Sequence, residues 1–80
     1  MDTKTWLETH ENLIAEEQIV RWFDYEYMVL ELRHIGKLYA DAAVELMRLQ
    51  RGAERAVALR KLLESREAAV RSAISQTPRG

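Results

Sequence analysis

The 80-residue sequence contains no cysteine, which excludes disulfide bonds and thiolate metal sites. It has one proline, Pro78, and three glycines, of which Gly80 is the last residue. β-branched residues are sparse, while Ala, Leu, Glu and Arg are abundant, and this composition favours helix throughout. No apolar run approaches the roughly 20 residues that cross a bilayer, and the N-terminus has no signal-peptide pattern. We therefore expect a cytoplasmic protein with no membrane partner.

A chain of this length forms one small domain, residues 1–80, which is only marginally stable alone. Without disulfides, oligomerisation is a usual remedy. Residues 1–50 carry five basic and ten acidic side chains, whereas residues 51–80 carry seven basic and three acidic ones. Two oppositely charged helices packed side by side explain this asymmetry, and so does a set of arginines that holds phosphates. The net charge of −1 argues against duplex nucleic acid as a partner.

Apolar residues recur in steps of three and four from Tyr25 to Leu49, which predicts a long helix over residues 18–50. The expected seam consists of Tyr25, Met28, Leu32, Ile35, Tyr39, Ala42, Leu46 and Leu49. Gly36 interrupts this seam at a cost of up to about 1 kcal/mol relative to alanine. A close approach by another helix, or by a ligand, would account for it.

Gly52 fits the left-handed position that commonly ends a helix. We expect a second helix over residues 53–75, a short N-terminal helix over residues 3–16 and a loose tail over residues 76–80. A competing arrangement runs one continuous helix through Gly52. The expected fold is all-α, a long helical hairpin with a short N-terminal helix, completed by homo-oligomerisation because a hairpin cannot enclose its own wide apolar stripes.

Four of the six aromatic residues stand together in the stretch RWFDYEYM, residues 21–28. Aromatic residues are enriched at the cores of interfaces, so we expect an oligomer interface here. Its candidate residues are Trp22, Phe23, Tyr25, Met28, Leu32 and Ile35. A surface on which a nucleobase stacks is the other interpretation.

The sequence offers no catalytic apparatus. Glu31-x-x-His34 has the spacing of half a di-iron motif but occurs once. His10-Glu11 lacks the second histidine of a zinc-protease motif, and there is neither a glycine-rich phosphate loop nor a nearby Ser-His-Asp set. We predict no enzyme activity, no cofactor and no metal, with a metal-carrying helical oligomer as an alternative. The candidate ligand-binding residues, for phosphates or bases, are Arg33, Lys37, Tyr39, Trp22, Tyr25 and Arg66.

Arg66 interrupts the apolar face of the second helix. One interpretation is that its stem packs while its head reaches water or an acid. The other is that its guanidinium points into an interface cavity and binds an anion.

The stretch LYADAAVELMRLQRGAERAVALRKLLESREAAVRSAI, residues 38–74, resembles the helical hairpin domain of phage proteins that sequester cyclic-nucleotide alarm signals, the sponges acting against CBASS and Thoeris defences. The matching residues are Leu46, Leu49, Glu54, Ala58, Leu59, Lys61, Leu62, Glu64 and the run 68–74. The sequence departs from the family pattern at Gly36, where many relatives have lysine, at Tyr39, where they have glycine, and at Ala68, where they have an aromatic residue. Residues 1–27 do not align.

This resemblance implies a non-enzymatic anti-defence protein that sequesters a cyclic nucleotide at interfaces between its own subunits. It also implies a location in the cytoplasm of a host bacterium. Two phosphates and two flat bases are chemically matched to paired arginines and stacked aromatic rings. The alternative function is a small oligomeric interaction module that inhibits or scaffolds a host protein through its aromatic end.

Overall fold

In the computed structural model, which describes residues 3–75, the chain is all-α, and none of these residues lies in a β-strand. In chain order the elements are α1 (Trp6–Thr9), α2 (Glu11–Glu16), the 3-10 helix η1 (Gln18–Phe23), α3 (Leu30–Leu46) and α4 (Ala53–Ser75). The tail expected over residues 76–80 lies outside the described residues. The all-α class predicted from composition is confirmed.

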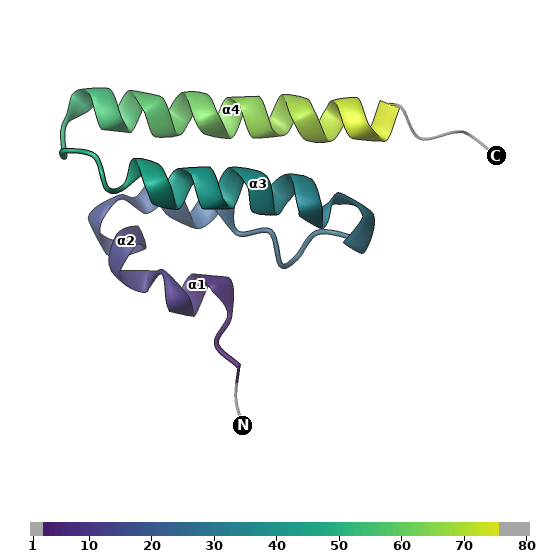
Figure 1. Cartoon of the computed structure of the whole chain (residues 1–80), viewed down its shortest axis with the longest axis horizontal. Helices are drawn as coiled ribbons and strands as arrows, with labels where there is room; N and C mark the ends of the chain where they lie inside the picture. The colour runs from purple at the N-terminus through teal and green to yellow at the C-terminus, as the bar shows by residue number, and fades with distance from the viewer. Residues whose placement is uncertain (1–2, 76–80) are drawn as a thin grey trace.

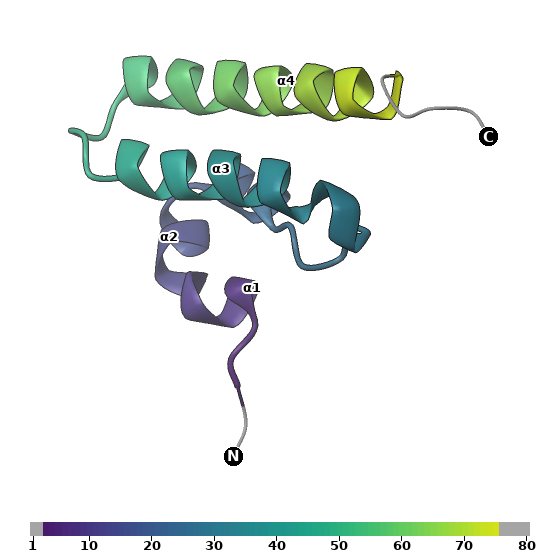
Figure 2. The ribbon, with the colours of Figure 1, turned by 45° about the vertical axis from the view of Figure 1, so that its right-hand side comes forward.

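α3 lies between α4 on one side and the N-terminal helices on the other (Figures 1 and 2). α3 and α4 run antiparallel, joined by a short turn, and η1 lies behind α3 in the view of Figure 1. Measured on its backbone, the molecule extends 46 × 38 × 15 Å, so it is about two helix layers thick in its shortest direction. Such a thin molecule offers few fully enclosed positions, and the core is correspondingly small.

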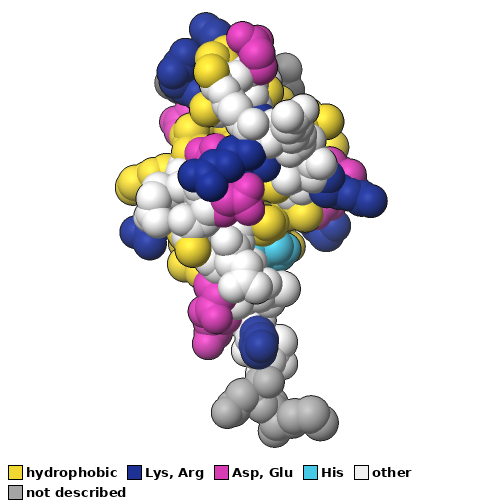
Figure 3. All heavy atoms as spheres, turned by 90° about the vertical axis from the view of Figure 1, so that its left-hand side faces the viewer, with side chains coloured by type: hydrophobic (Ala, Val, Ile, Leu, Met, Phe, Trp, Pro, Cys, Tyr) yellow, Lys and Arg dark blue, Asp and Glu magenta, His cyan; other side chains and the backbone are white. Residues whose placement is uncertain are grey.

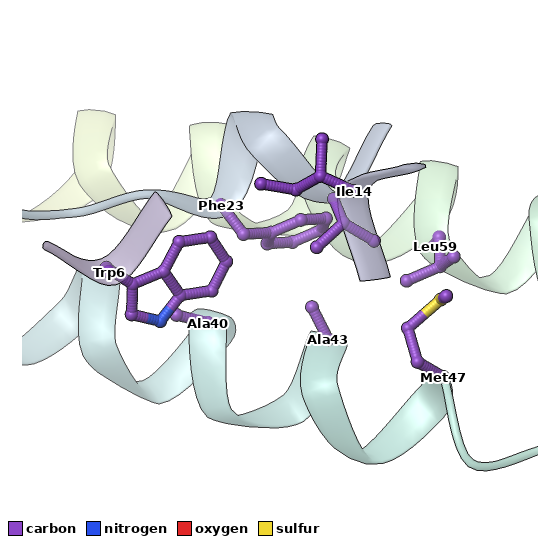
Figure 4. Packing of buried hydrophobic residues seen from close by; sticks show 8 residues of the cluster. Trp6, Ile14, Phe23, Ala40, Ala43, Met47 and Leu59 are labelled. Atoms are coloured by element: carbon purple, nitrogen blue, oxygen red, sulfur yellow. The ribbon is translucent and has the colours of Figure 1, made fainter. Parts of the chain in front are cut away.

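The core forms where η1 and the N-terminal helices meet the α3–α4 pair. Its buried side chains are Trp6, Ile14, Val20, Phe23, Ala40, Ala43, Met47 and Leu59. Figure 4 shows Trp6, Ile14 and Phe23 directed toward the row that Ala40 and Ala43 on α3 form with Met47, which directly follows α3. The small side chains in this row allow the large apolar groups of the N-terminal segment to lie close to the backbone of α3.

The long helix expected over residues 18–50 is not present, because α3 begins at Leu30 and ends at Leu46. Residues 18–29 instead form η1 and a loop that folds back along α3. Val20 and Phe23 are fully buried in that position, so they cover the apolar stripe of α3 rather than extend it. The N-terminal helix expected over residues 3–16 is also divided, into α1 and α2.

The two internal glycines differ from each other in their surroundings. A Cβ on Gly36 would lie 2.5 Å from Cβ of Tyr25, so the close approach that the sequence called for is made by the chain's own loop. Gly52 does not adopt a left-handed conformation, contrary to the sequence-based expectation. Its carbonyl instead accepts the first bond of α4, from the backbone N–H of Ala56 at 3.1 Å.

A capping box starts α1 and makes the N-terminus sensitive to pH. The hydroxyl of Thr5 accepts from the backbone N–H of Glu8 at 3.1 Å, and the carboxylate of Glu8 accepts from the backbone N–H of Thr5 at 2.9 Å. This second bond is the main reason why the pKa of Glu8 lies below its ordinary value of 4.5. The ionised form is therefore favoured by folding.

We expect this contribution to be complete well above pH 4.5 and to be lost as the pH falls through the lowered pKa of Glu8. Glu8→Gln preserves a side-chain acceptor but removes the titration, so its stability should fall less between about pH 6 and pH 3. Urea denaturation at a series of pH values measures this. Glu11→Gln is the control, because the side chain of Glu11 forms no hydrogen bond within residues 3–75. Equal pH slopes for the wild type and Glu8→Gln would contradict the prediction.

Candidate functional site

A hollow of about 360 Å³ opens at the end of the molecule where α3 begins and α4 finishes. Its walls come from the loop before α3, from the first turn of α3 and from the last turns of α4. The lining residues are Tyr27, Met28, Val29, Leu32, Arg66, Glu67, Val70 and Arg71. The volume lies within the range of small-molecule sites, and most of the walls are apolar.

Arg66 forms the inner part of this hollow and is only 6% exposed. Its Nη1 donates to the backbone carbonyl of Trp22 at 2.8 Å and to that of Asp24 at 3.4 Å. Its Nη2 donates to the Tyr27 hydroxyl at 3.3 Å and lies 3.9 Å from the carboxylate of Glu67. Its buried Nε–H has no acceptor in the part of the chain that the structure describes. The guanidinium thus holds the loop in place while one of its donors remains unused.

Arg71 lies one and a half turns further along α4 and is exposed. Its guanidinium has no ion pair within the described part of the chain. The hollow therefore contains one deep, engaged arginine, one outer, available arginine and the carboxylate of Glu67, beside apolar side chains such as Leu32 and Val70. A flat apolar group with an attached oxyanion fits this combination chemically.

The structure does not bring the other candidate cations to this hollow. Arg33 donates from Nε to the carbonyl of Met28 at 2.9 Å and from Nη2 to the carbonyl of Glu26 at 3.0 Å, so it supports the loop. Lys37 is exposed and pairs with Asp41 at 2.8 Å. That hydrogen bond is the main cause of the raised pKa of Lys37.

The three remaining aromatic candidates also lie apart. Tyr39 is half-buried and shares a 3.0 Å hydrogen bond with the Ser65 hydroxyl, linking α3 to α4. Tyr25 packs against Gly36, with its Cβ close to the helix backbone. Trp22 is 63% exposed but does not line the hollow. Arg66 is therefore the one member of the predicted ligand set found there.

Most residues expected at an oligomer interface are used within the chain itself. Phe23 is fully buried in the core and Met28 is also buried. Tyr25, Leu32 and Ile35 are half-buried, and of the set only Trp22 is largely free for a partner. The apolar residues most exposed near the hollow are Tyr27, Val29 and Leu30.

Sequence reasoning missed Tyr27, Val70 and Arg71 as site residues. Their positions in the chain could have indicated them, because the loop before one helix and the end of its antiparallel partner lie at the same end of the helix pair.

The sequence also gave no specific role to Arg55, which is 4% exposed. Arg55 donates to the carbonyls of Met47 and Leu49 at 3.2 and 3.1 Å and pairs with Glu16 at 2.8 Å.

A second hollow, of about 400 Å³, lies on the N-terminal segment and is lined by Leu7, Glu8, Glu11, Ile14 and Arg21. None of its charged residues is buried. At the turn between α3 and α4, basic and acidic side chains are interspersed, with hydrophobic areas scattered between them (Figure 3). Of these two hollows, the one lined by Arg66 combines a buried charge with apolar walls.

No family model matches this sequence, and comparison with curated proteins and with solved structures finds no match. Across residues 3–75, no helix is long and apolar enough to cross a membrane. Glu31 and His34 stand on α3, but the described residues include no group of three or more metal-ligating side chains.

Proposed function

We propose that this chain is a non-enzymatic binding protein that sequesters a cyclic nucleotide at interfaces between copies of itself. The observation that carries the proposal is the hollow that combines buried Arg66, exposed Arg71 and apolar walls. The resemblance of residues 38–74 to phage proteins that sequester such signals supports it. On that resemblance, the proposed setting is the cytoplasm of an infected bacterium.

The chemistry of the hollow matches one half of a cyclic nucleotide. The guanidinium of Arg71 offers a planar fork of donors for a phosphate oxygen pair. The ring of Tyr27 and the side chains of Val29 and Val70 offer apolar surface to a base.

A second copy would complete the other half of the site. The rim of the hollow exposes Val29 and Leu30, the latter 74% exposed, and an exposed apolar edge of this kind is typical of interfaces. A cyclic dinucleotide made of two equal halves has two-fold symmetry, which an isologous interface shares. Two hollows facing each other would then enclose both bases and both phosphates.

We expect a thermal-shift screen with cyclic dinucleotides, cyclic trinucleotides and cyclic ADP-ribose isomers to give one strong responder. A ligand at one hundred times its dissociation constant stabilises by about 2.7 kcal/mol, which raises the melting temperature of a domain this small by on the order of 10 °C. Arg71→Ala should remove most of this shift without changing the melting temperature of the free protein, because Arg71 has no ion pair to lose within residues 3–75.

Arg60→Ala is the matched control for Arg71→Ala. Arg60 is also exposed on α4, three turns earlier on nearly the same side, and it does not line the hollow. Both variants change the net charge equally, so a loss specific to Arg71→Ala reports on the site. Equal responses of the two variants, or the absence of any responder, would count against the proposal.

The alternative function, a protein-interaction module, is favoured by one observation. Trp22 is 63% exposed, although large aromatic side chains are usually buried, and aromatic residues are enriched at protein interfaces. Phe23 does not belong to this surface because it lies in the core. A screen without responders, together with a partner that binds the wild type but not Trp22→Ala, would support this function instead.

A further inference from the structure

Two buried arginines of α4 hold η1 at both of its ends. Before η1 begins, Arg55 pairs with Glu16 at 2.8 Å and with Glu17 at 3.4 Å. Where η1 ends, Arg66 donates to the carbonyl of Trp22 at 2.8 Å. The two arginines are eleven residues apart, which is three turns, so they lie on the same face of α4 about 16 Å from each other.

Arg66 belongs to this pair of anchors and also to the hollow. The same guanidinium that binds the end of η1 donates to the Tyr27 hydroxyl and lines the hollow beside Val29. Tyr27, Met28 and Val29 follow η1 by only a few residues, so the position of η1 determines where this wall stands. The hollow can therefore have its observed shape only while η1 is docked on α4.

The donors of Arg66 are incompletely satisfied. Its Nε–H is buried and has no acceptor among residues 3–75, and a buried donor without an acceptor is destabilising. An oxyanion in the hollow would add negative charge next to this guanidinium, which lines the hollow. Such an anion is expected to stabilise the docked arrangement that Arg66 holds together.

We infer that docking of residues 18–29 on α4 and binding of an oxyanion in the hollow form one coupled equilibrium, in which Glu16 and Glu17 are positioning residues for a site they do not touch. The inference rests on the hollow of the proposed function, but not on which nucleotide fills it. Coupling of this kind is reciprocal: the anion strengthens docking by the same factor by which docking strengthens anion binding.

Inorganic pyrophosphate is a suitable probe, at constant ionic strength so that screening does not vary. Titration by calorimetry should show that Glu16→Gln/Glu17→Gln binds pyrophosphate about 5-fold more weakly than the wild type or worse. The matched control is Glu45→Gln/Glu64→Gln, which removes two exposed carboxylates from surface ion pairs and changes the net charge equally. Removing two negative charges would by itself strengthen anion binding. A loss of pyrophosphate affinity that occurs only in Glu16→Gln/Glu17→Gln therefore reports on the docking of η1.

Hydrogen exchange is measured on the wild type, so this test does not depend on the stability of the variants. In the wild type, pyrophosphate should slow exchange of the backbone N–H of Val20, which donates to the carbonyl of Glu17 at 3.0 Å and lies outside the hollow. Protection confined to residues 27–29 and 66–71, equal affinities of the two double variants, or no pyrophosphate binding by the wild type would each overturn the inference. Pyrophosphate binding with the expected coupling, but without any cyclic-nucleotide responder, would refute the proposed function and leave this inference standing.

Discussion

Replacing Arg55 with methionine should destabilise the protein by on the order of 10 °C in melting temperature. Methionine keeps an unbranched apolar stem but removes every donor. The carbonyls of Met47 and Leu49 would lose their donors, and the carboxylates of Glu16 and Glu17 would lose their counter-ion. Glu16 and Glu17 remain 39% and 21% exposed, so water can solvate their carboxylates in part, and the rest of the uncompensated charge adds to the loss of stability.

Arg48→Met is the matched control, because Arg48 also forms an ion pair, with Glu45 at 3.4 Å. Its side chain is 76% exposed, and an ion pair of that kind contributes little. Adding Glu16→Gln and Glu17→Gln to Arg55→Met should restore part of the loss, since the uncompensated carboxylates are then gone. Thermal denaturation followed by circular dichroism measures all of these variants. Similar melting temperatures for Arg55→Met and Arg48→Met would show that Arg55 is not an anchor.

Gly36→Ala should destabilise the protein by about 1 to 3 kcal/mol, although alanine is the better helix former. The added methyl group would lie 2.5 Å from Cβ of Tyr25 and 2.8 Å from Sδ of Met28. The methionine side chain can move, but Cβ of Tyr25 is fixed to the backbone, so the loop before α3 must shift. This overpacking outweighs the gain in helix propensity, which is at most about 1 kcal/mol.

Gly52→Ala tests whether the effect comes from the contact or from glycine itself. Apart from its two chain neighbours, no described residue has an atom within 4 Å of a Cβ added at Gly52, and the φ angle of Gly52 is not positive. The change at this position should therefore be small, limited to the modest preference for glycine over alanine at a helix N-cap. Urea denaturation of both variants gives the comparison. If Gly36→Ala proves as stable as the wild type, the loop does not pack against α3 as observed.

Some features followed directly from the residues. The abundance of Ala, Leu, Glu and Arg and the near-absence of Pro and Gly predicted an all-helical chain, because helix propensity summed over long segments is informative. The sequence placed the second long helix over residues 53–75, and α4 covers Ala53–Ser75. It also indicated that Gly36 needs a close neighbour, without identifying Tyr25 as that neighbour.

Other features could not be predicted from the spacing of residue types along the sequence. The three-and-four spacing of Tyr25 and Met28 is compatible with helix, but these residues lie in a loop that packs against the apolar stripe of α3. Folding back buries Phe23 fully, a gain that extending α3 into solvent would not provide. Arg66 was recognised as a break in an apolar face, yet nothing in the sequence specifies that it binds the carbonyl of Trp22, 44 residues away.

The sequence by itself determined that this protein is helical and where its last helix lies, because these properties depend on local propensity and on periodicity along one helix. Only the tertiary structure decided that residues 18–29 cover α3, that Arg55 and Arg66 anchor η1, and that Arg66 and Arg71 share a hollow with Tyr27. These arrangements depend on which acceptors the buried donors bond to and on which segments bury the apolar faces of the helices. Both are set by contacts between residues far apart in the chain.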